Sequence, residues 1–264
     1  MTRSARWVAA NFDRRAPRYD QSTMHRWQAE QAVKFLAPAP GQRILDVATG
    51  TGLAARAAAA RLGSPGAVIG VDISAGMLRQ AQQAAGERRC WFVRADAAAA
   101  PFPAEVFDAV LCVAAVPYFS DLVGALREWR RVCRPQAQAV VTVPAVDGIP
   151  PWRALRQAAV GEGLPLADPS GPLADSQQRV RALAAAGWAC NQIREVVFEQ
   201  PREDPQAGFR RIVDSGLVEP LRTASTQVRQ RVWARFETLY RTVSIEVHRT
   251  LLLRLAVPSM TGRS

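Results

Sequence analysis

The segment Arg43–Ala55 constrains the fold of this chain more than any other stretch. Its apolar run Ile44–Ala48 predicts a buried parallel strand, and the Thr-Gly-Thr-Gly sequence that follows predicts a sharp turn. The alanine-rich run Leu53–Leu62 then predicts a helix. Gly50 and Gly52 lack a Cβ atom, so the backbone can turn tightly and lie against a ligand at the helix N-terminus. This order of elements predicts the nucleotide-binding start of a doubly wound α/β sheet.

A second apolar run, Ala67–Val71, predicts the next strand and ends at Asp72. This carboxylate follows Gly52 by 20 residues (72 − 52). That is close to the spacing at which an acid at the end of the second strand binds a ribose diol. A carboxylate suits this role because it accepts hydrogen bonds from two neighbouring hydroxyls. We therefore expect Asp72 to bind the ribose of a nucleotide.

Asp46, inside the first predicted strand, separates two classes of nucleotide. Gly50-x-Gly52-x-x-Ala55 also fits the loose dinucleotide fingerprint, but a nearby carboxylate would repel a pyrophosphate. It would attract a ligand that carries an ammonium and a sulfonium, and S-adenosyl-L-methionine has both cations and no phosphate. The alternative is that Asp46 only accepts hydrogen bonds from N–H groups of the loop. A NAD-dependent dehydrogenase is the least favoured class.

Several segments follow one another in the order found in class I S-adenosylmethionine-dependent methyltransferases, and the chain resembles this family. They are residues 44–52, 68–74, 94–97, 101–103, 107–110 and 125–135, which together span about residues 40–145. Upstream, Tyr19-Asp20 and Arg26-Trp27 are similar to the entry segment of ubiquinone/menaquinone-type C-methyltransferases and their natural-product relatives. The resemblance implies a Rossmann-like α/β fold with a seven-stranded, mostly parallel sheet, an antiparallel edge strand and helices on both faces. It also implies an N-terminal helical cap, lid insertions and methyl transfer from S-adenosyl-L-methionine.

The resemblance further implies which residues bind the cofactor. Tyr19 is expected beside its methionine end and Met77 near its adenosine, although Met77 could equally be a core residue. Asp96 is expected to accept from the adenine amino group and the N–H of Ala97 to bond a ring nitrogen, with a helix cap as the alternative role of Asp96. The complete predicted set is Tyr19, Asp46, Ala48, Thr49, Gly50, Thr51, Gly52, Asp72, Ile73, Met77, Asp96, Ala97, Cys112 and Val113.

Four regions are expected along the chain. Residues 1–40 form a helical cap, residues 41–145 the cofactor-binding core, residues 146–172 an insertion that lines the substrate site, and residues 173–264 the rest of the core with a helical lid at about 204–243. The later strands are expected at residues 90–94, 107–113, 139–143, 188–198 and 250–257, the last of them antiparallel at the sheet edge near the sixth. Helices are expected at residues 6–12, 24–36, 74–85, 121–132, 152–160, 173–186, 205–216 and 226–243.

The end of the fourth strand bears on the methyl acceptor. Methyltransferases that act on base amino groups carry Asn or Asp there, whereas this chain has Ala115-Val116-Pro117-Tyr118, which argues against such a substrate. The segment also departs from that of the quinone enzymes, which argues against a quinone. We expect a small-molecule acceptor, a secondary metabolite or its precursor, methylated on carbon, oxygen or nitrogen. The alternatives are an RNA or protein methyltransferase, and a cofactor-binding protein that catalyses a rearrangement or only binds.

No catalytic residue is assigned from the sequence, because a general base is needed only when the acceptor must lose a proton. The weak candidates are His248, Tyr19 and His25. His248 would share a strand face with Glu246, a pair that is more often structural. His25 is expected to be exposed on its helix. No Cys/His spacing suits zinc, so no metal is expected.

Composition limits the partners. The net charge is +11, but 33 of the 34 basic residues are arginine (34 − 1, Lys34) and they are scattered, so nucleic-acid binding is not favoured. No apolar run reaches the ~20 residues of a membrane helix, and the N-terminal residues do not resemble a secretory signal. The four cysteines form no CxxC pair, so we expect them to be free thiols of a cytoplasmic protein. A homodimer is possible.

Overall fold

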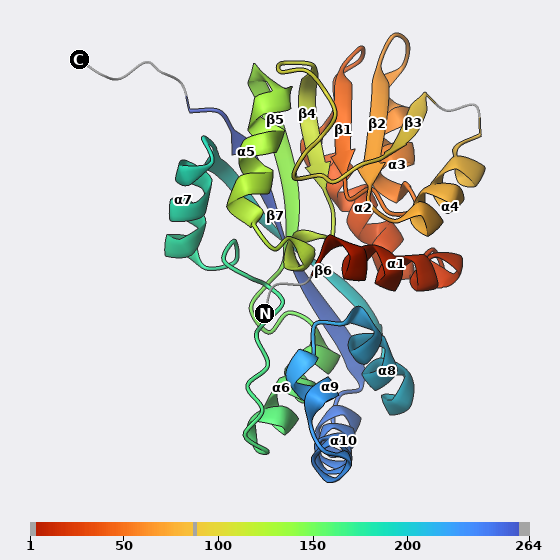
Figure 1. The fold of residues 1–264 in the computed structure, drawn as a ribbon, viewed down its shortest axis with the longest axis vertical. Helices are drawn as coiled ribbons and strands as arrows, with labels where there is room; N and C mark the ends of the chain where they lie inside the picture. Colours follow the sequence, from red (N-terminus) through yellow and green to blue (C-terminus); the bar gives the residue numbers. More distant parts are fainter. Residues whose placement is uncertain (1–3, 87–88, 259–264) are drawn as a thin grey trace.

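The protein is built around a seven-stranded sheet with the strand order β3-β2-β1-β4-β5-β7-β6 (Figure 1). The computed structural model describes residues 4–86 and 89–258. β1 to β5 run parallel, whereas β7 is antiparallel to both of its neighbours, β5 and β6. The last strand is antiparallel and pairs with the sixth, as expected, but it lies inside the sheet, between β5 and the edge strand β6, rather than at the edge. The strands are β1 (Arg43–Val47), β2 (Ala67–Asp72), β3 (Cys90–Arg94), β4 (Phe107–Cys112), β5 (Cys133–Pro144), β6 (Ala189–Pro201) and β7 (Ile245–Ala256).

Helices cover both faces of the sheet. One face packs against α2 (Thr23–Leu36), α3 (Leu53–Leu62) and α4 (Ala75–Ala85), whose small and aliphatic side chains form one core with β1 and β2. The other face packs against α5 (Leu122–Val132) and α7 (Ser176–Ala185). In α5 the fully buried Trp129 donates from Nε1 to the carbonyl of Ala97 at 2.9 Å, which fixes the loop after β3 to this face.

Helices lie at the carboxyl end of the sheet in two places: the single helix α1, and a group of four helices. α1 (Ala5–Tyr19) crosses the edge where β1 and β2 end (Figure 1). A second group consists of α6 (Pro150–Val160), α8 (Pro205–Ser215), α9 (Glu219–Thr223) and α10 (Thr226–Arg241), and it gathers beside the far ends of β6 and β7 (Figure 1). This group has its own apolar core, which includes the buried Phe236 and Tyr240. A 3-10 turn (Val116–Tyr118) follows β4 between the two groups.

The predicted elements exist, but several of their bounds differ for local physical reasons. α1 continues to Tyr19, so Pro17 lies inside the helix, where its missing N–H leaves the carbonyl of Asp13 without its helical partner. α7 starts at Ser176 rather than Leu173, since Asp175 caps it by accepting from the Gln178 amide. β5 begins at Cys133 rather than Ala139, so Pro135 extends the strand and no turn separates α5 from β5.

Two further observations on the described residues concern the expected environment of the protein. Within residues 4–86 and 89–258, no helix is long and apolar enough to cross a membrane. Over the same residues no group of three or more His, Cys, Asp or Glu is placed to hold a metal ion. All four cysteines are free thiols.

Candidate active site

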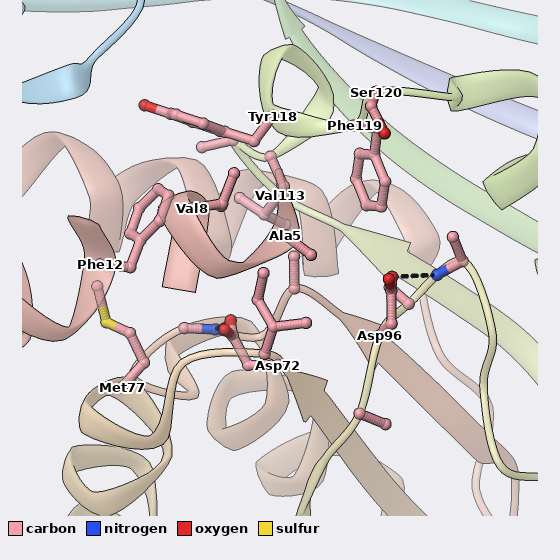
Figure 2. A pocket seen from close by; sticks show the side chains of 18 of the residues that line it. Ala5, Val8, Phe12, Asp72, Met77, Asp96, Val113, Tyr118, Phe119 and Ser120 are labelled. Carbon is pink, nitrogen blue, oxygen red and sulfur yellow. Dashed lines mark hydrogen bonds between the residues drawn. The ribbon is translucent and has the colours of Figure 1, made fainter. Parts of the chain in front are cut away.

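A pocket lies where β1, β2 and β4 end, beneath α1, at the point where the strand order changes direction (Figures 1 and 2). We call it the cofactor pocket. Nine predicted residues line it: Tyr19, Ala48, Gly50, Asp72, Ile73, Met77, Asp96, Ala97 and Val113. Figure 2 shows Asp72 and Met77 on one side, with Val8, Phe12 and Tyr118 across from them. Tyr19 at the end of α1 was predicted, whereas Ala5, Val8 and Phe12 of the same helix and Tyr118 were not in the predicted set.

A narrower pocket adjoins the first one behind the glycine turn, and we call it the methionine pocket. Asp46, Thr49 and Thr51 line it together with Tyr19 and Gly50. His25, from the start of α2, lines it as well. The structure therefore gathers the predicted residues of β1 and its turn around one continuous site.

Two predicted residues line neither pocket, and each has a packing role instead. Gly52 has a φ of 78°, and a Cβ atom on it would lie 2.8 Å from the ring of Phe92. Its missing side chain thus allows α3 and the turn to approach β3, which is a need of packing rather than of ligand contact. Cys112 is fully buried in β4, paired in the sheet with Val47 and Val141.

Asp72 ties the turn together while keeping part of its carboxylate free. Its two oxygens accept one hydrogen bond each, from the amides of Gly50 and Ser74, both at 2.8 Å. Burial raises the pKa of the Asp72 carboxyl, and these hydrogen bonds oppose that shift. A carboxylate has about four acceptor positions and the amide of Ile73 also bonds to Asp72, so at least one position remains for a ligand hydroxyl.

Asp46 is an almost completely buried acid that forms no ion pair within the described part of the chain. Its side chain is 1% exposed, and it accepts from the Thr49 hydroxyl at 2.5 Å and from the amide of Ala55. Burial raises the pKa of Asp46 to about 7. Both expected roles are therefore compatible: the loop does bond to Asp46, and the acid still lines a pocket where a cationic ligand group would stabilise its ionised form.

The turn provides the space that a bound nucleoside needs. Gly50 has a φ of 57°, and a Cβ atom on it would have only the Tyr19 ring within 4.0 Å. The side chain of any other residue would therefore enter the pocket. Asp96 accepts from the amide of Ala98 at 2.9 Å, as Figure 2 shows, and Met77 is fully buried yet lines the pocket. For these two residues the local role does not exclude the expected binding role.

Asp13 links α1 to the start of α4 by hydrogen bonds and so holds α1 over the cofactor pocket. One oxygen of this carboxylate accepts from the hydroxyl of Ser74 and the amide of Gly76, both at 2.7 Å, at the start of α4. Burial alone would raise the pKa of Asp13, but these hydrogen bonds hold it below the usual value. The contact therefore stabilises the fold above pH 4 and weakens as the pH falls through the lowered pKa.

Asp13→Ala should weaken binding of the cofactor about three- to tenfold, because α1 loses roughly 1 kcal/mol of attachment over the pocket. Calorimetric titration measures the affinity, and hydrogen exchange should show faster exchange of the α1 amides. Asp175→Ala is a matched control, since it removes a capping carboxylate from α7 away from both pockets. Equal cofactor affinities in all three proteins would show that Asp13 does not fasten the helix in solution.

Two of the three weak catalytic candidates, Tyr19 and His25, lie side by side at the methionine pocket, whereas His248 lies apart from it. The expectation that His25 is exposed is wrong: its ring stacks on Tyr19 with centroids 4.3 Å apart, because the start of α2 packs beneath α1. Burial lowers the pKa of His25 to about 4, so this imidazole is neutral at physiological pH. Burial raises the pKa of Tyr19 to about 12, which keeps its phenol protonated. His248 is buried beside Glu246, with 2.6 Å between Nε2 and the carboxylate, and it lines neither pocket.

A third space, which we call the acceptor cavity, continues from these pockets and has a volume of about 460 Å³. It shares Tyr118 with the cofactor pocket, and Ala114 and His25 with the methionine pocket. α1 and α2 border it on one side, and α6 and α8 on the other. Pro117, Ile149, Trp152, Ile212 and Leu217 supply apolar wall.

The sheet order, the glycine turn and the two carboxylates at the ends of β1 and β2 define a class I S-adenosylmethionine-dependent methyltransferase. Comparison with known proteins agrees, since residues 44–136 match the family described as Methyltransferase domain. The chain is 36% identical to the 2-phytyl-1,4-naphtoquinone methyltransferase of Trichormus variabilis over 51% of this chain and 63% of the relative. It is 33% identical to the enzyme of the same name from Nostoc punctiforme, over 57% of this chain and 70% of the relative.

The chain belongs to the class I S-adenosylmethionine-dependent methyltransferases, and its cofactor is S-adenosyl-L-methionine. The chain spans about 63% of the length of the first relatives that it matches. The same fold occurs in the YcgJ protein of Bacillus subtilis, with a TM-score of 0.58 at 19% identity, over 89% of this chain and 100% of YcgJ. By contrast, the alignment with the naphthoquinone methyltransferase of Trichormus variabilis covers about half of this chain.

Proposed function

We propose that this protein transfers the methyl group of S-adenosylmethionine to a small, ring-bearing acceptor bound in the acceptor cavity. The observation that carries this proposal is the shared boundary of the three spaces, at Ala114, Tyr118 and His25. A cofactor on one side of that boundary and an acceptor on the other would meet at the carboxyl end of β4.

The residues at the cofactor's side fit S-adenosylmethionine group by group. When bound, this cofactor supplies a methyl group on a sulfonium, which is already activated for displacement. Asp72 would accept from the ribose hydroxyls, and Asp46 would stabilise the cationic end, while Gly50 leaves room for the chain between them. Asp96 and Ala97 would bind the adenine. Of the other predicted residues, Tyr19, Ala48, Thr49, Thr51, Ile73, Met77 and Val113 would line the same path, whereas Gly52 and Cys112 would not.

The chain's own contribution to the reaction is to hold the acceptor and to exclude water. Because the leaving group is activated, correct positioning supplies most of the rate enhancement. The apolar side chains of Ile149, Trp152 and Leu217 favour a flat apolar ring system in the acceptor cavity. The neutral imidazole of His25, at the boundary, can accept a hydrogen bond from an acceptor hydroxyl, but its pKa of about 4 makes it a weak base for removing the proton.

A cavity between helices favours a small molecule over an RNA or a protein as acceptor. Helices border it on two sides, so a large substrate would have to pass between α1 and α8. The named relatives act on a 2-phytyl-1,4-naphtoquinone, which is a ring-bearing small molecule. We extend that class of acceptor, not that compound, to this chain.

Formation of S-adenosylhomocysteine tests the proposal. The protein is incubated with S-adenosylmethionine and, separately, with reduced naphthoquinones, polyketide-like phenols, bulk RNA and a protein mixture. We expect S-adenosylhomocysteine in equal amount to a methylated product with at least one small ring compound and with neither macromolecule. Methylation confined to RNA or protein would contradict the small-molecule proposal. Acceptor conversion without S-adenosylhomocysteine would instead indicate a rearrangement.

A further inference from the structure

We infer that the acceptor is a ring compound with a carboxylate, and that Arg15 of α1 binds this carboxylate in the acceptor cavity. The inference rests on the proposed function and specifies its substrate class. It starts from the charges in the cavity: Arg15, Arg18 and Arg211 line it, whereas Glu203 is the acidic residue among its described lining.

Arg15 differs from Arg211 in having no acidic partner. Arg211 forms ion pairs with Glu203 at 3.1 Å and with Glu246 at 3.6 Å, so its charge is compensated. Among the described residues no hydrogen bond or ion pair involves the guanidinium of Arg15, and its Nη1 is buried without a partner. The guanidinium lies over the ring of Phe12 at 4.7 Å and over that of Tyr19 at 5.7 Å. Aromatic faces hold a cation in place but leave its N–H groups unused.

Unpaired buried polar atoms gather around the same cavity. Besides Arg15, the lining residue Trp152 has a buried nitrogen donor with no hydrogen-bond partner in the described structure, and Gln28 Oε1 and His25 Nδ1 are buried in the same state, whereas Nη2 of Arg211 has Glu246 at 3.6 Å. Donors in this state favour a ligand that brings oxygen acceptors. A carboxylate fits an arginine best, because its two oxygens match two parallel N–H groups of the guanidinium.

The position of Arg15 assigns the anion to the acceptor rather than to the cofactor. Arg15 lines the acceptor cavity but neither the cofactor pocket nor the methionine pocket. The ring of Phe12, beneath the guanidinium, is 4.8 Å from that of Tyr118 at the shared boundary. A carboxylate on Arg15 would therefore hold the attached ring system next to the place where the methyl group is transferred.

Calorimetry with a matched pair of probes tests the inference. 1-Hydroxy-2-naphthoic acid and its uncharged methyl ester are titrated into the full-length protein saturated with S-adenosylhomocysteine. We expect the acid to bind at least about tenfold more tightly than the ester, as a charge-assisted contact with an arginine requires. Arg15→Gln should remove this preference and leave the affinity for S-adenosylhomocysteine unchanged.

Arg14→Gln is the control for the change of charge. Arg14 is the neighbouring arginine of α1, is exposed, bonds to the carbonyl of Ala10 and the side chain of Asn11, and lines none of the three spaces. This variant should keep the full preference for the acid. A thermal melt of each variant checks that the fold is retained.

The outcomes separate this inference from the proposed function. If S-adenosylhomocysteine itself fails to bind, the cofactor assignment and the proposed function are wrong. If it binds, but the acid shows no advantage over the ester or neither probe binds, the proposed function survives and the carboxylate inference is overturned. A loss of S-adenosylhomocysteine affinity in Arg15→Gln would also overturn it, because Arg15 would then serve the cofactor's own carboxylate.

Discussion

Replacing Gly50 by valine should abolish binding of S-adenosylmethionine, with a loss of at least about a hundredfold in affinity. A branched side chain at a φ of 57° is strained, and its methyl groups would project toward Tyr19 into the space that the nucleoside needs. Because only the Tyr19 ring lies within 4.0 Å of the added Cβ atom, the core itself is not overpacked. The fold should therefore survive with a modest loss of stability.

Gly63→Val provides the matched control for backbone strain. Gly63 has a φ of 60°, and a Cβ atom on it would meet nothing within 4 Å. It follows α3 and lines none of the three spaces. Both variants should lose about 1–2 kcal/mol of stability in denaturant melts. Only Gly50→Val should lose the calorimetric signal of cofactor binding, and a normal affinity in that variant would refute our assignment of the turn.

Asp46→Asn should weaken the binding of S-adenosylmethionine by about 30-fold or more at pH 7.5. The substitution removes a buried charge that faces a cationic ligand, an interaction whose loss costs about 2 kcal/mol or more. Asparagine keeps an oxygen that can accept from Thr49 and Ala55, so the loop should keep its conformation. Calorimetry on both proteins gives the ratio of affinities.

The pH dependence identifies Asp46 as the source of this effect. Its pKa is about 7 in the free protein, and a bound cation lowers it, so binding releases a proton below pH 7. The affinity of the unmodified protein should thus fall up to tenfold per unit between pH 7 and pH 6, whereas that of Asp46→Asn should fall less steeply. Parallel profiles for the two proteins would show that another group controls the binding.

Stability should change in the opposite direction to binding. Because the pKa of Asp46 is raised by folding, this group favours the folded state below pH 4, and that contribution is lost as the pH rises to about 7. At pH 8 the folded protein therefore holds an unfavourably buried charge. At pH 8 the Asp46→Asn variant should therefore melt at the same temperature as the unmodified protein or at a higher one. A variant that binds the cofactor less tightly but melts no lower is folded, so its weaker binding does not come from misfolding.

The cofactor half of the site was predictable because its residues are close in sequence. The strand, glycine turn and helix of residues 43–62 encode their own geometry, and the run that ends in Asp72 supplies the next strand. Each of these signals depends on local backbone preference and on apolar periodicity. Asp46, Gly50 and Asp72 accordingly lie around one site in the structure.

The features that the sequence did not reveal depend on contacts between distant segments. Asp13 bonds to Ser74 across 61 positions of the chain, and no local pattern marks such a pair. His25 is an exception, because it is near Tyr19 in sequence, but no local pattern predicts that the connection between α1 and α2 stacks the two rings. Gly52 fits a ligand-binding motif, but its neighbour Phe92 lies on β3 and shows that packing requires the glycine. The acceptor cavity combines segments from α1 to α8 and has no motif of its own.

The helices α8, α9 and α10 interrupt the chain between β6 and β7, two strands that pair along their whole length. They also keep an apolar core of their own with α6. An ancestor could therefore have gained, lost or exchanged this segment while the paired strands held the scaffold in register. The part that contacts the acceptor can therefore change in evolution independently of the part that binds the methyl donor. Exchange of residues 202–244 between related proteins is the corresponding laboratory route to new acceptors.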